Sequence, residues 1–459
     1  MADVLARAAR QAGDEVFFST GTDEHGGKIA EKAAELKLTP QALADTMSAQ
    51  FSKLAHDLDI SNDAFIRTTD PGHVERAKII WKALKDDIYK GSYEGWYCTG
   101  DEEFFSEKVV KDNKGICPDH NRPYEKVEEE NYFFRLSAYG DRILEAINNG
   151  AFTIVPESRR NEIVSLIESG LEDISISRPK ENVSWGIPVP SDAKQVMYVW
   201  FEALMNYITV LGYPEHADFK AYWPANVQVI GKGILRFHAA IWPAMLMGLK
   251  LPLPDTLYAH GYVTVDNQKM SKSLGNAVSP HDIIAKYGPD AFRYYFLRHI
   301  PSYGDGDFNW DAFDAAYNNE LANELGNAVQ RTAAMIQKYQ DGSIGDVPEA
   351  EHDYAQYRTA LAECRFDRAL DEVWEQVRGL NQYIDQEKPW TLAKEDDTSH
   401  LQEVLAYQVS NLLEIADLLE PFLPSTAERI RDVFDSGTIK PITATLFPKQ
   451  EDKPTPATK

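Results

Sequence analysis

Three short β-rich runs in the first two-thirds of the chain each end at a glycine or at polar residues, with helical patterns nearby. They are residues 16–20, stopped by Gly21, residues 227–230, stopped by Gly231, and residues 257–259, which end at His260 and Gly261. Strands that alternate with helices are typical of an α/β fold. Because such sheets bind ligands at the carboxyl ends of their strands, we expect functional residues just after these runs.

From residue 316 onward the pattern is helical. Apolar residues recur three and four positions apart, as in helices that bury one face. These positions are Leu321, Leu325, Ala328, Val329 and Ile336; Phe366, Ala369, Leu370, Val373, Val377 and Leu380; and Leu401, Val404, Leu405, Leu412, Ile415 and Leu419. Residues 425–428, which follow Pro424, have the spacing of a capping box and predict one more helix beginning at Ser425. The sequence therefore predicts a helix bundle.

Residues 94–184 differ from both parts, since they hold two of the three cysteines and an acidic run at residues 128–130. We interpret them as an insertion into the α/β domain. The predicted organisation is an α/β domain in residues 1–93 and 185–315, the insertion in 94–184, a helical domain in 316–447 and a disordered tail in 448–459.

Composition excludes several classes of protein. The chain has 459 residues and a formal net charge of −25, so it is a poor candidate for coating DNA, although clustered basic residues would still permit nucleic-acid binding. No apolar run reaches the ~18 residues of a membrane span, and the first residues do not resemble a signal peptide. Three cysteines cannot form a disulfide framework, and they favour a cytoplasmic location.

The strongest local signal is the pentapeptide Lys269, Met270, Ser271, Lys272 and Ser273. Two lysines three positions apart in a loop can place ammonium groups on a polyphosphate, where negative charge builds up in a transition state. A generic Lys-Ser-Lys run is more often a solvated basic loop, but the full pentapeptide after a strand is far more specific.

This pentapeptide resembles the second signature of class I aminoacyl-tRNA synthetases, and its surroundings resemble methionyl-tRNA synthetases over almost the whole chain. The landmarks are residues 21–26 (GTDEHG), 60–63 (ISND), 93–98 (YEGWYC), 129–134 (EENYFF), 177–178 (SR), 185–188 (WGIP), 198–200 (YVW) and 237–239 (FHA). The resemblance implies a Rossmann-like catalytic domain with a small connective insertion, followed by an α-helical anticodon-binding domain.

The same resemblance implies a methionine–tRNA ligase. ATP, with Mg²⁺, would activate methionine to methionyl-adenylate, and the acyl group would pass to tRNA(Met). Residues 269–273 would bind ATP, with Lys269 and Lys272 as catalytic residues. The chain contains no Gly-x-x-x-x-Gly-Lys-Ser/Thr phosphate loop, so ATP use through that motif is not supported.

By resemblance, four residues belong to the methionine site: Asp23, Trp200, His238 and Arg178. A carboxylate at Asp23 can hold an ammonium group or a ribose hydroxyl, and an aromatic wall suits a thioether. Each residue also has a structural interpretation. Asp23 would be a turn or cap aspartate, Trp200 plain core, His238 a satisfied structural histidine and Arg178 a surface arginine.

The helical domain carries Asn327 and Arg331, one turn apart on one helix face, and Trp390 near the end of another helix. The resemblance assigns all three to anticodon recognition. Single-stranded bases are read by stacking on aromatic rings and by hydrogen bonds to their edges. The alternative interpretation makes Trp390 a core plug beside a helix-ending proline.

The insertion holds Cys98-x-x-Asp101 and Cys117-x-x-His120, and two residues between paired ligands is zinc-knuckle spacing. Many relatives have a cysteine where Asp101 stands. Two alternatives stay open: a Zn²⁺ site formed by two cysteines, an aspartate and a histidine, or a knuckle without metal whose thiols serve only to pack.

The chain departs from the family pattern in three places. No histidine begins the His-x-Gly-His tetrad of the first class I signature, and the resemblance starts just after that tetrad, so we expect the chain as given to be impaired in activating methionine. Gly233 stands where an aspartate is usual, and Glu202 where aspartate is commoner. A second hypothesis is therefore a tRNA-binding fragment that cannot activate an amino acid.

A third hypothesis, a relative that uses leucine, isoleucine or valine, is weaker because residues 94–184 are too few for the large editing insertion of those enzymes. No dimerising module follows residue 459, which favours a monomer.

Overall fold

The structure is a computed structural model that describes residues 1–99, 103–105, 107–118, 121–270, 278–348, 353–395, 397–439 and 445–449. The chain forms two compact units. The sheet unit comprises Phe17–Lys53 and Asn62–Ala259, and the bundle unit comprises Met1–Val16, Leu54–Ser61 and His260–Lys459. Within the described ranges, no helix is both long and apolar enough to cross a membrane. The domain borders predicted from the sequence stay predictions.

The sheet unit contains the parallel strands expected from the sequence. Strand β1 (Ser19–Thr22) pairs in parallel with β2 (Ala64–Arg67). A second sheet has the order β11–β12–β6, formed by Val227–Gly231, Thr256–His260 and Thr153–Val155. The strands predicted at residues 227–230 and 257–259 are therefore confirmed.

The first strand begins later than predicted, at Ser19. The amide of Phe18 donates to the side chain of Asp63 (2.7 Å) instead of to a neighbouring strand. Gly21 then lets the paired backbones approach, because a Cβ there would lie 1.9 Å from the carbonyl oxygen of Ile66. Only glycine fits this close approach, which brings the end of β1 against β2.

Helices surround these strands and complete the apolar core. They are α2 (Gly27–Glu35), α3 (Pro40–Asp57), α4 (Pro71–Ala83), α6 (Gly140–Asn148), α7 (Glu157–Glu168), α8 (Val199–Ala203), α9 (Asn206–Thr209), α10 (Ala217–Tyr222) and α11 (Trp242–Gly248), with the π-helix η4 at Phe237–Ile241 and short 3₁₀ turns at Lys85–Asp87, Leu136–Tyr139 and Lys232–Ile234. Ile154 and Leu257 from the strands pack in one cluster with Trp242 and Leu246 of α11. This core fixes the strand ends that carry the candidate site.

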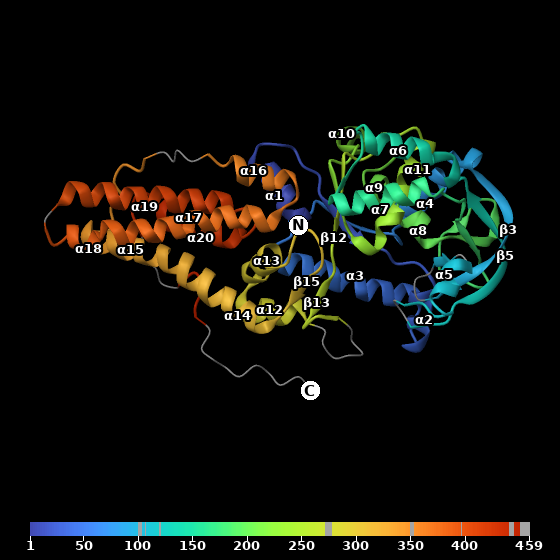
Figure 1. Cartoon of the computed structure of the whole chain (residues 1–459), viewed down its shortest axis with the longest axis horizontal. Helices are drawn as coiled ribbons and strands as arrows, with labels where there is room; N and C mark the ends of the chain where they lie inside the picture. Colours follow the sequence, from blue (N-terminus) through green and yellow to red (C-terminus); the bar gives the residue numbers. More distant parts are fainter. Residues whose placement is uncertain are drawn as a thin grey trace. The chain divides into compact units, whose positions relative to one another are not determined.

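Two antiparallel sheets complete the sheet unit. One has the order β4–β3–β5–β7, and its long strands β3 (Ile88–Cys98) and β5 (Glu125–Phe134) run side by side (Figure 1). Its short strands are β4 (Glu103–Phe105) and β7 (Ile174–Ser175), with α5 (Glu107–Asp112) between β4 and β5. The other has the order β8–β10–β9, formed by Ser177–Pro179, Asp192–Met197 and Pro188–Val189.

The bundle unit begins with a small sheet of order β14–β13–β15, formed by Gln268–Lys269, Val263–Val265 and Gly306–Phe308. Its helices are α1 (Ala2–Gln11), α12 (Pro280–Tyr287), α13 (Pro289–Arg298), α14 (Trp310–Ala315), the π-helix η6 (Ala316–Gly326), α15 (Asn327–Tyr339), α16 (Ala355–Ala362), α17 (Phe366–Glu387), α18 (Pro389–Leu392), α19 (Thr398–Leu419) and α20 (Pro424–Phe434).

The long helices α15, α17 and α19 lie side by side (Figure 1). Every apolar position predicted to share a helix face is buried there, which confirms the predicted bundle. Residues 450–459 of the predicted tail lie outside the described residues.

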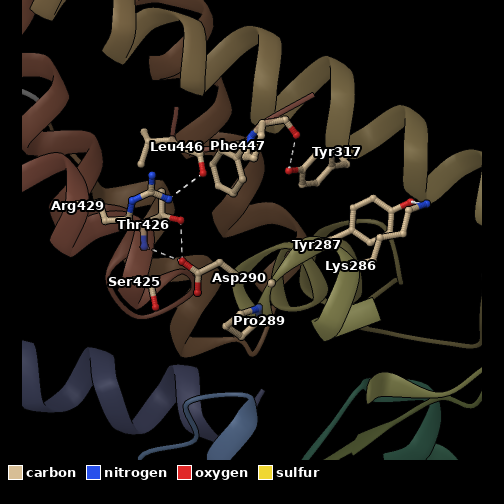
Figure 2. Close-up of a pocket in the computed structure, with 12 residues that line it drawn as sticks. Lys286, Tyr287, Pro289, Asp290, Tyr317, Ser425, Thr426, Arg429, Leu446 and Phe447 are labelled. Carbon is tan, nitrogen blue, oxygen red and sulfur yellow. Dashed lines mark hydrogen bonds between the residues drawn. The ribbon is translucent and has the colours of Figure 1, made fainter. Parts of the chain in front are cut away.

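The predicted capping box is wrong. Helix α20 begins at Pro424, its N-cap is Leu423, and no side chain of its own caps it. Instead, Oδ2 of Asp290 in α13 accepts from both the amide and the hydroxyl of Thr426, each at 2.6 Å (Figure 2). The helix is therefore capped by a residue from another helix, which a local sequence pattern cannot reveal.

Candidate functional site

The loop after β1 turns Asp23 toward solvent and buries the two residues that follow it. Glu24 accepts from the Arg67 guanidinium at 2.8 and 2.9 Å, and its amide donates to Thr68 (2.9 Å). Although burial is the largest single influence and opposes ionisation, hydrogen bonds from Arg67 and neighbouring hydroxyls lower the pKa of Glu24. The loop is thus anchored through an ionised Glu24, and Asp23 is presented at the carboxyl end of the strand.

The segment from α8 to α11 forms an aromatic wall. Trp200 of α8 stacks on Phe237 of η4, with ring centroids 4.4 Å apart and planes at 14°. His238, next to Phe237, is buried and its Nε2 lies 2.8 Å from the Oη of Tyr207 in α9. The structure therefore joins Trp200 and His238 through the neighbouring residues Phe237 and Tyr207, which the sequence analysis did not single out.

The hydrogen bonds of His238 fix its protonation. Its Nδ1 lies 2.9 Å from the carbonyl oxygen of Ile234, so Nδ1 carries the hydrogen and Nε2 accepts from the Tyr207 hydroxyl. Burial lowers the pKa of His238 to about 4. The imidazole is therefore neutral at physiological pH, and this side of the candidate site carries no positive charge from it.

Arg178 lies in β8 and is buried, not exposed. Its Nη1 donates to Oγ of Ser175 (2.9 Å) and to the carbonyl of Ser177 (2.7 Å). The guanidinium also lies over the rings of Tyr198 (4.6 Å) and Tyr97 (5.6 Å). These contacts exclude the interpretation of Arg178 as a surface arginine. Tyr198, whose ring lies under the guanidinium, is two positions before Trp200 in the sequence. Its role in the methionine site stays a prediction.

Sequence reasoning missed a buried polar network centred on Glu202 of α8, which is 0% exposed. Its Oε1 lies 2.7 Å from Nδ1 of His25, and its Oε2 lies 2.9 Å from Nε2 of His73 in α4. His73 in turn pairs with the hydroxyl of Thr209 in α9 at 2.8 Å. The sequence signals for Glu202 were its place inside the otherwise apolar run at residues 199–204 and its place where the family more often has aspartate.

In the bundle unit, the structure brings two of the three predicted anticodon residues together. The guanidinium of Arg331 lies 5.7 Å from the ring centroid of Trp390 and bonds to Oδ1 of Asp385 at 2.9 Å. Asn327, one turn earlier on α15, is exposed, and Trp390 is half-buried. Trp390 is therefore not a fully buried core plug, and it has ring surface left to stack on.

The remaining predicted residues are only partly described. The backbone of Lys269 ends β14, and Met270 is exposed, whereas Ser271, Lys272, Ser273, Asp101 and His120 lie outside the described residues. Cys98 and Cys117 are both buried in one small cluster with Val110 and Tyr124. No group of three or more potential metal ligands occurs among the residues that the structure describes.

A cavity of about 280 Å³ in the bundle unit is separate from the candidate sites (Figure 2). It is lined by α12 and α13, by Ser425 and Arg429 of α20, and by residues 446–448. None of the predicted site residues that the structure describes lines this cavity, so the candidate sites rest on the contacts described above.

Comparison with known proteins gives a consistent result. The family model described as tRNA synthetases class I (M) matches residues 1–126 and 119–333. The chain is 45% identical to the methionine–tRNA ligase of Caldanaerobacter subterraneus subsp. tengcongensis over 445 residues, 94% of this chain and 69% of that protein. It is also 45% identical to the methionine–tRNA ligase of Clostridium acetobutylicum, again over 94% and 69% of the two chains.

Among solved structures, the chain is similar to Mycobacterium tuberculosis methionyl-tRNA synthetase in complex with methionyl-adenylate. The TM-score is 0.90 at 36% sequence identity, covering 97% of this chain and 94% of that chain. This likeness confirms the predicted fold class, an α/β class I catalytic fold followed by helices. The chain belongs to the class I tRNA synthetase family, in the branch whose curated members are named methionine–tRNA ligase.

Proposed function

We propose that this chain is a methionine–tRNA ligase that uses ATP to form methionyl-adenylate and transfers the methionyl group to tRNA(Met). The observation that carries the proposal is the 0.90 TM-score to a synthetase with bound methionyl-adenylate, obtained over almost the whole chain. The wall formed by Trp200 and Phe237 supports it, because a thioether sulfur contacts aromatic rings favourably.

In this proposal each site residue has a defined task. Trp200 and Phe237 hold the methionine side chain, and the neutral His238, fixed by Tyr207, completes the pocket without repelling the substrate ammonium. The exposed carboxylate of Asp23 holds that ammonium. Arg178 supports the pocket wall through Tyr198.

The reaction has two transfers. The methionine carboxylate oxygen attacks the α-phosphorus of ATP, which enters with Mg²⁺, and the bond to the β-phosphate oxygen breaks to release pyrophosphate. A hydroxyl at the 3′ end of the tRNA then attacks the acyl carbon and AMP leaves. Lys269 and Lys272 would hold the pyrophosphate as its charge develops, since preorganised charge of this kind stabilises such transition states.

For tRNA(Met), we propose the face of α15 and α18 that carries Asn327, Arg331 and Trp390. The guanidinium of Arg331 lies over one face of the Trp390 ring, and Asp385 orients that guanidinium. The remaining ring surface suits a stacked anticodon base, and Asn327 can hydrogen-bond a base edge.

Zinc is proposed for the insertion as an alternative to a metal-free knuckle. The burial of Cys98 and Cys117 in one cluster fits either alternative. About one zinc per chain in metal analysis would support a four-ligand site with Asp101 and His120, because structural zinc is four-coordinate. Metal-free protein of normal stability would overturn it.

Methionine-dependent exchange of pyrophosphate into ATP separates the ligase from the tRNA-binding fragment. Exchange stimulated by methionine, and not by leucine, supports the ligase. Binding of tRNA with a CAU anticodon but no exchange would support the fragment instead. A monomer in the cytoplasm is proposed from the sequence alone, and sedimentation of the purified chain tests the monomer.

A further inference from the structure

We propose that Glu202 is a positioning residue of the methionine pocket: its buried carboxylate holds together the three segments that carry Asp23, Trp200 and Tyr207. The inference rests on the proposed function, because it assigns Glu202 a task in that same site. In this role Glu202 does not contact the substrate. It acts through the residues that its hydrogen bonds hold in place.

The carboxylate of Glu202 has a partner on each oxygen. Oε1 lies 2.7 Å from His25 in the loop after β1, and Oε2 lies 2.9 Å from His73 at the start of α4. Nδ1 of His73 in turn lies 2.8 Å from the hydroxyl of Thr209 in α9. One side chain of α8 is thereby linked to the loop after β1, to α4 and to α9.

Three of the four segments in this network, all except α4, carry a candidate pocket residue two positions away. His25 follows Asp23, Glu202 follows Trp200, and Thr209 follows Tyr207, each by two. Two positions on a helix correspond to a rotation of about 200°, so on α8 and α9 the network and the pocket residues point to opposite sides. The network therefore lies behind the pocket wall.

The hydrogen bonds determine which atoms carry hydrogens. Hydrogen bonds from His25 and His73 lower the pKa of Glu202 even though its burial, the largest influence, opposes ionisation. An ionised carboxylate only accepts, so Nδ1 of His25 and Nε2 of His73 must donate. Nδ1 of His73 lies at hydrogen-bond distance, 2.8 Å, from the Thr209 hydroxyl.

Replacing Glu202 by glutamine tests this arrangement with little change in volume. The amide NH₂ would face an N–H of one histidine, so that ring must rotate or change tautomer and its segment must shift. A buried hydrogen-bonding group left without its partner costs roughly 10- to 100-fold in an equilibrium constant. We therefore expect methionine binding to weaken while folding is retained.

The experiment measures methionine and ATP affinities of the full chain by titration calorimetry. For Glu202→Gln we expect methionine affinity to fall about 10- to 100-fold with ATP affinity unchanged, and Glu202→Asp to recover most of the loss. The matched control is Asp173→Asn, because Asp173 also joins two segments, accepting from Tyr89 (2.9 Å) and Ser137 (2.6 Å). The control should leave both affinities unchanged.

The outcomes are distinguishable. If the unaltered chain binds no methionine, the proposed function fails. If it binds methionine and a folded Glu202→Gln binds it equally well, the positioning role fails while the proposed function stands. Should Glu202→Gln not fold, His73→Gln tests the same link: an unchanged methionine affinity there would also overturn the inference.

Discussion

His238 and Glu202 are both buried, and the structure gives each a set of partners that fixes its charge. His238 is held neutral between Ile234 and Tyr207, and Glu202 is held as a carboxylate between two histidines. The candidate pocket thus depends on the protonation states of His238 and Glu202 as well as on its shape. Both states can be tested.

The first prediction concerns His238. Burial lowers its pKa from 6.5 to about 4, so between those values the unfolded chain binds a proton that the folded chain does not. The free energy of unfolding must therefore fall as the pH drops through this window. Between pH 6.5 and 5 the loss is about 1.5 kcal/mol.

Amide hydrogen exchange of η4, corrected for intrinsic rates, measures this loss. The variant His238→Gln is the control, because glutamine keeps a partner for Tyr207 but does not titrate. Protection in the unaltered chain should fall more than in the variant on going from pH 6.5 to 5. Parallel losses in both proteins would contradict the assigned protonation of His238.

The second prediction concerns Trp390. Its half-exposed ring beneath Arg331 should stack on an anticodon base, so Trp390→Ala should weaken binding of tRNA with a CAU anticodon by about 1–3 kcal/mol. A filter-binding assay with a tRNA of altered anticodon is the control. The same loss for both tRNAs, or none, would show that Trp390 has only a structural role.

Sequence patterns predicted residues whose partners are near in the chain or whose type is specific to a site. Trp200 and His238 were named by resemblance to a family and not by spacing, and the structure joins them through Phe237 and Tyr207. The Glu202 network was missed because its partners are 177 and 129 residues away. Neither spacing nor residue type signals contacts between such distant positions.

At the scale of elements, local periodicity was a good guide where one face of a helix or strand is buried. The apolar faces of α15, α17 and α19 were predicted position by position and are buried. The ends of elements were predicted less well. Strand β1 begins later than predicted because the amide of Phe18 donates to the side chain of Asp63. Helix α20 is capped by Asp290, which is 136 residues from Thr426 in the sequence.

The third prediction tests that cap. Asp290→Ala removes both hydrogen bonds to Thr426 and should lower the stability of the bundle unit by about 1–2 kcal/mol. Ser425→Ala removes the residue that a local capping box would use and should change stability by less than about 0.5 kcal/mol. Hydrogen exchange of the first turn of α20 measures both. If Ser425→Ala lowered stability more than Asp290→Ala, the result would contradict capping by Asp290 and support the local capping box.

At the scale of the whole molecule, the candidate methionine residues lie in the sheet unit and the candidate anticodon residues in the bundle unit. The sequence predicted this separation of roles because strand and helix periodicities differ and because the resemblance extends over almost the whole chain. The sequence could not predict the side-chain hydrogen-bond networks inside each unit. Those depend on which distant segments the fold brings together.

The most direct test of the central claim is titration calorimetry of the full chain with a stable methionyl-adenylate analogue, in which a sulfamoyl group replaces the phosphate. Such analogues of reaction intermediates bind about 100-fold or more tighter than substrates. The account predicts tight binding of the methionyl analogue, and binding of the leucyl analogue that is weaker by at least about 10-fold, since one pocket must distinguish thioether from branched side chain. No binding, or equal binding of both analogues, would contradict it.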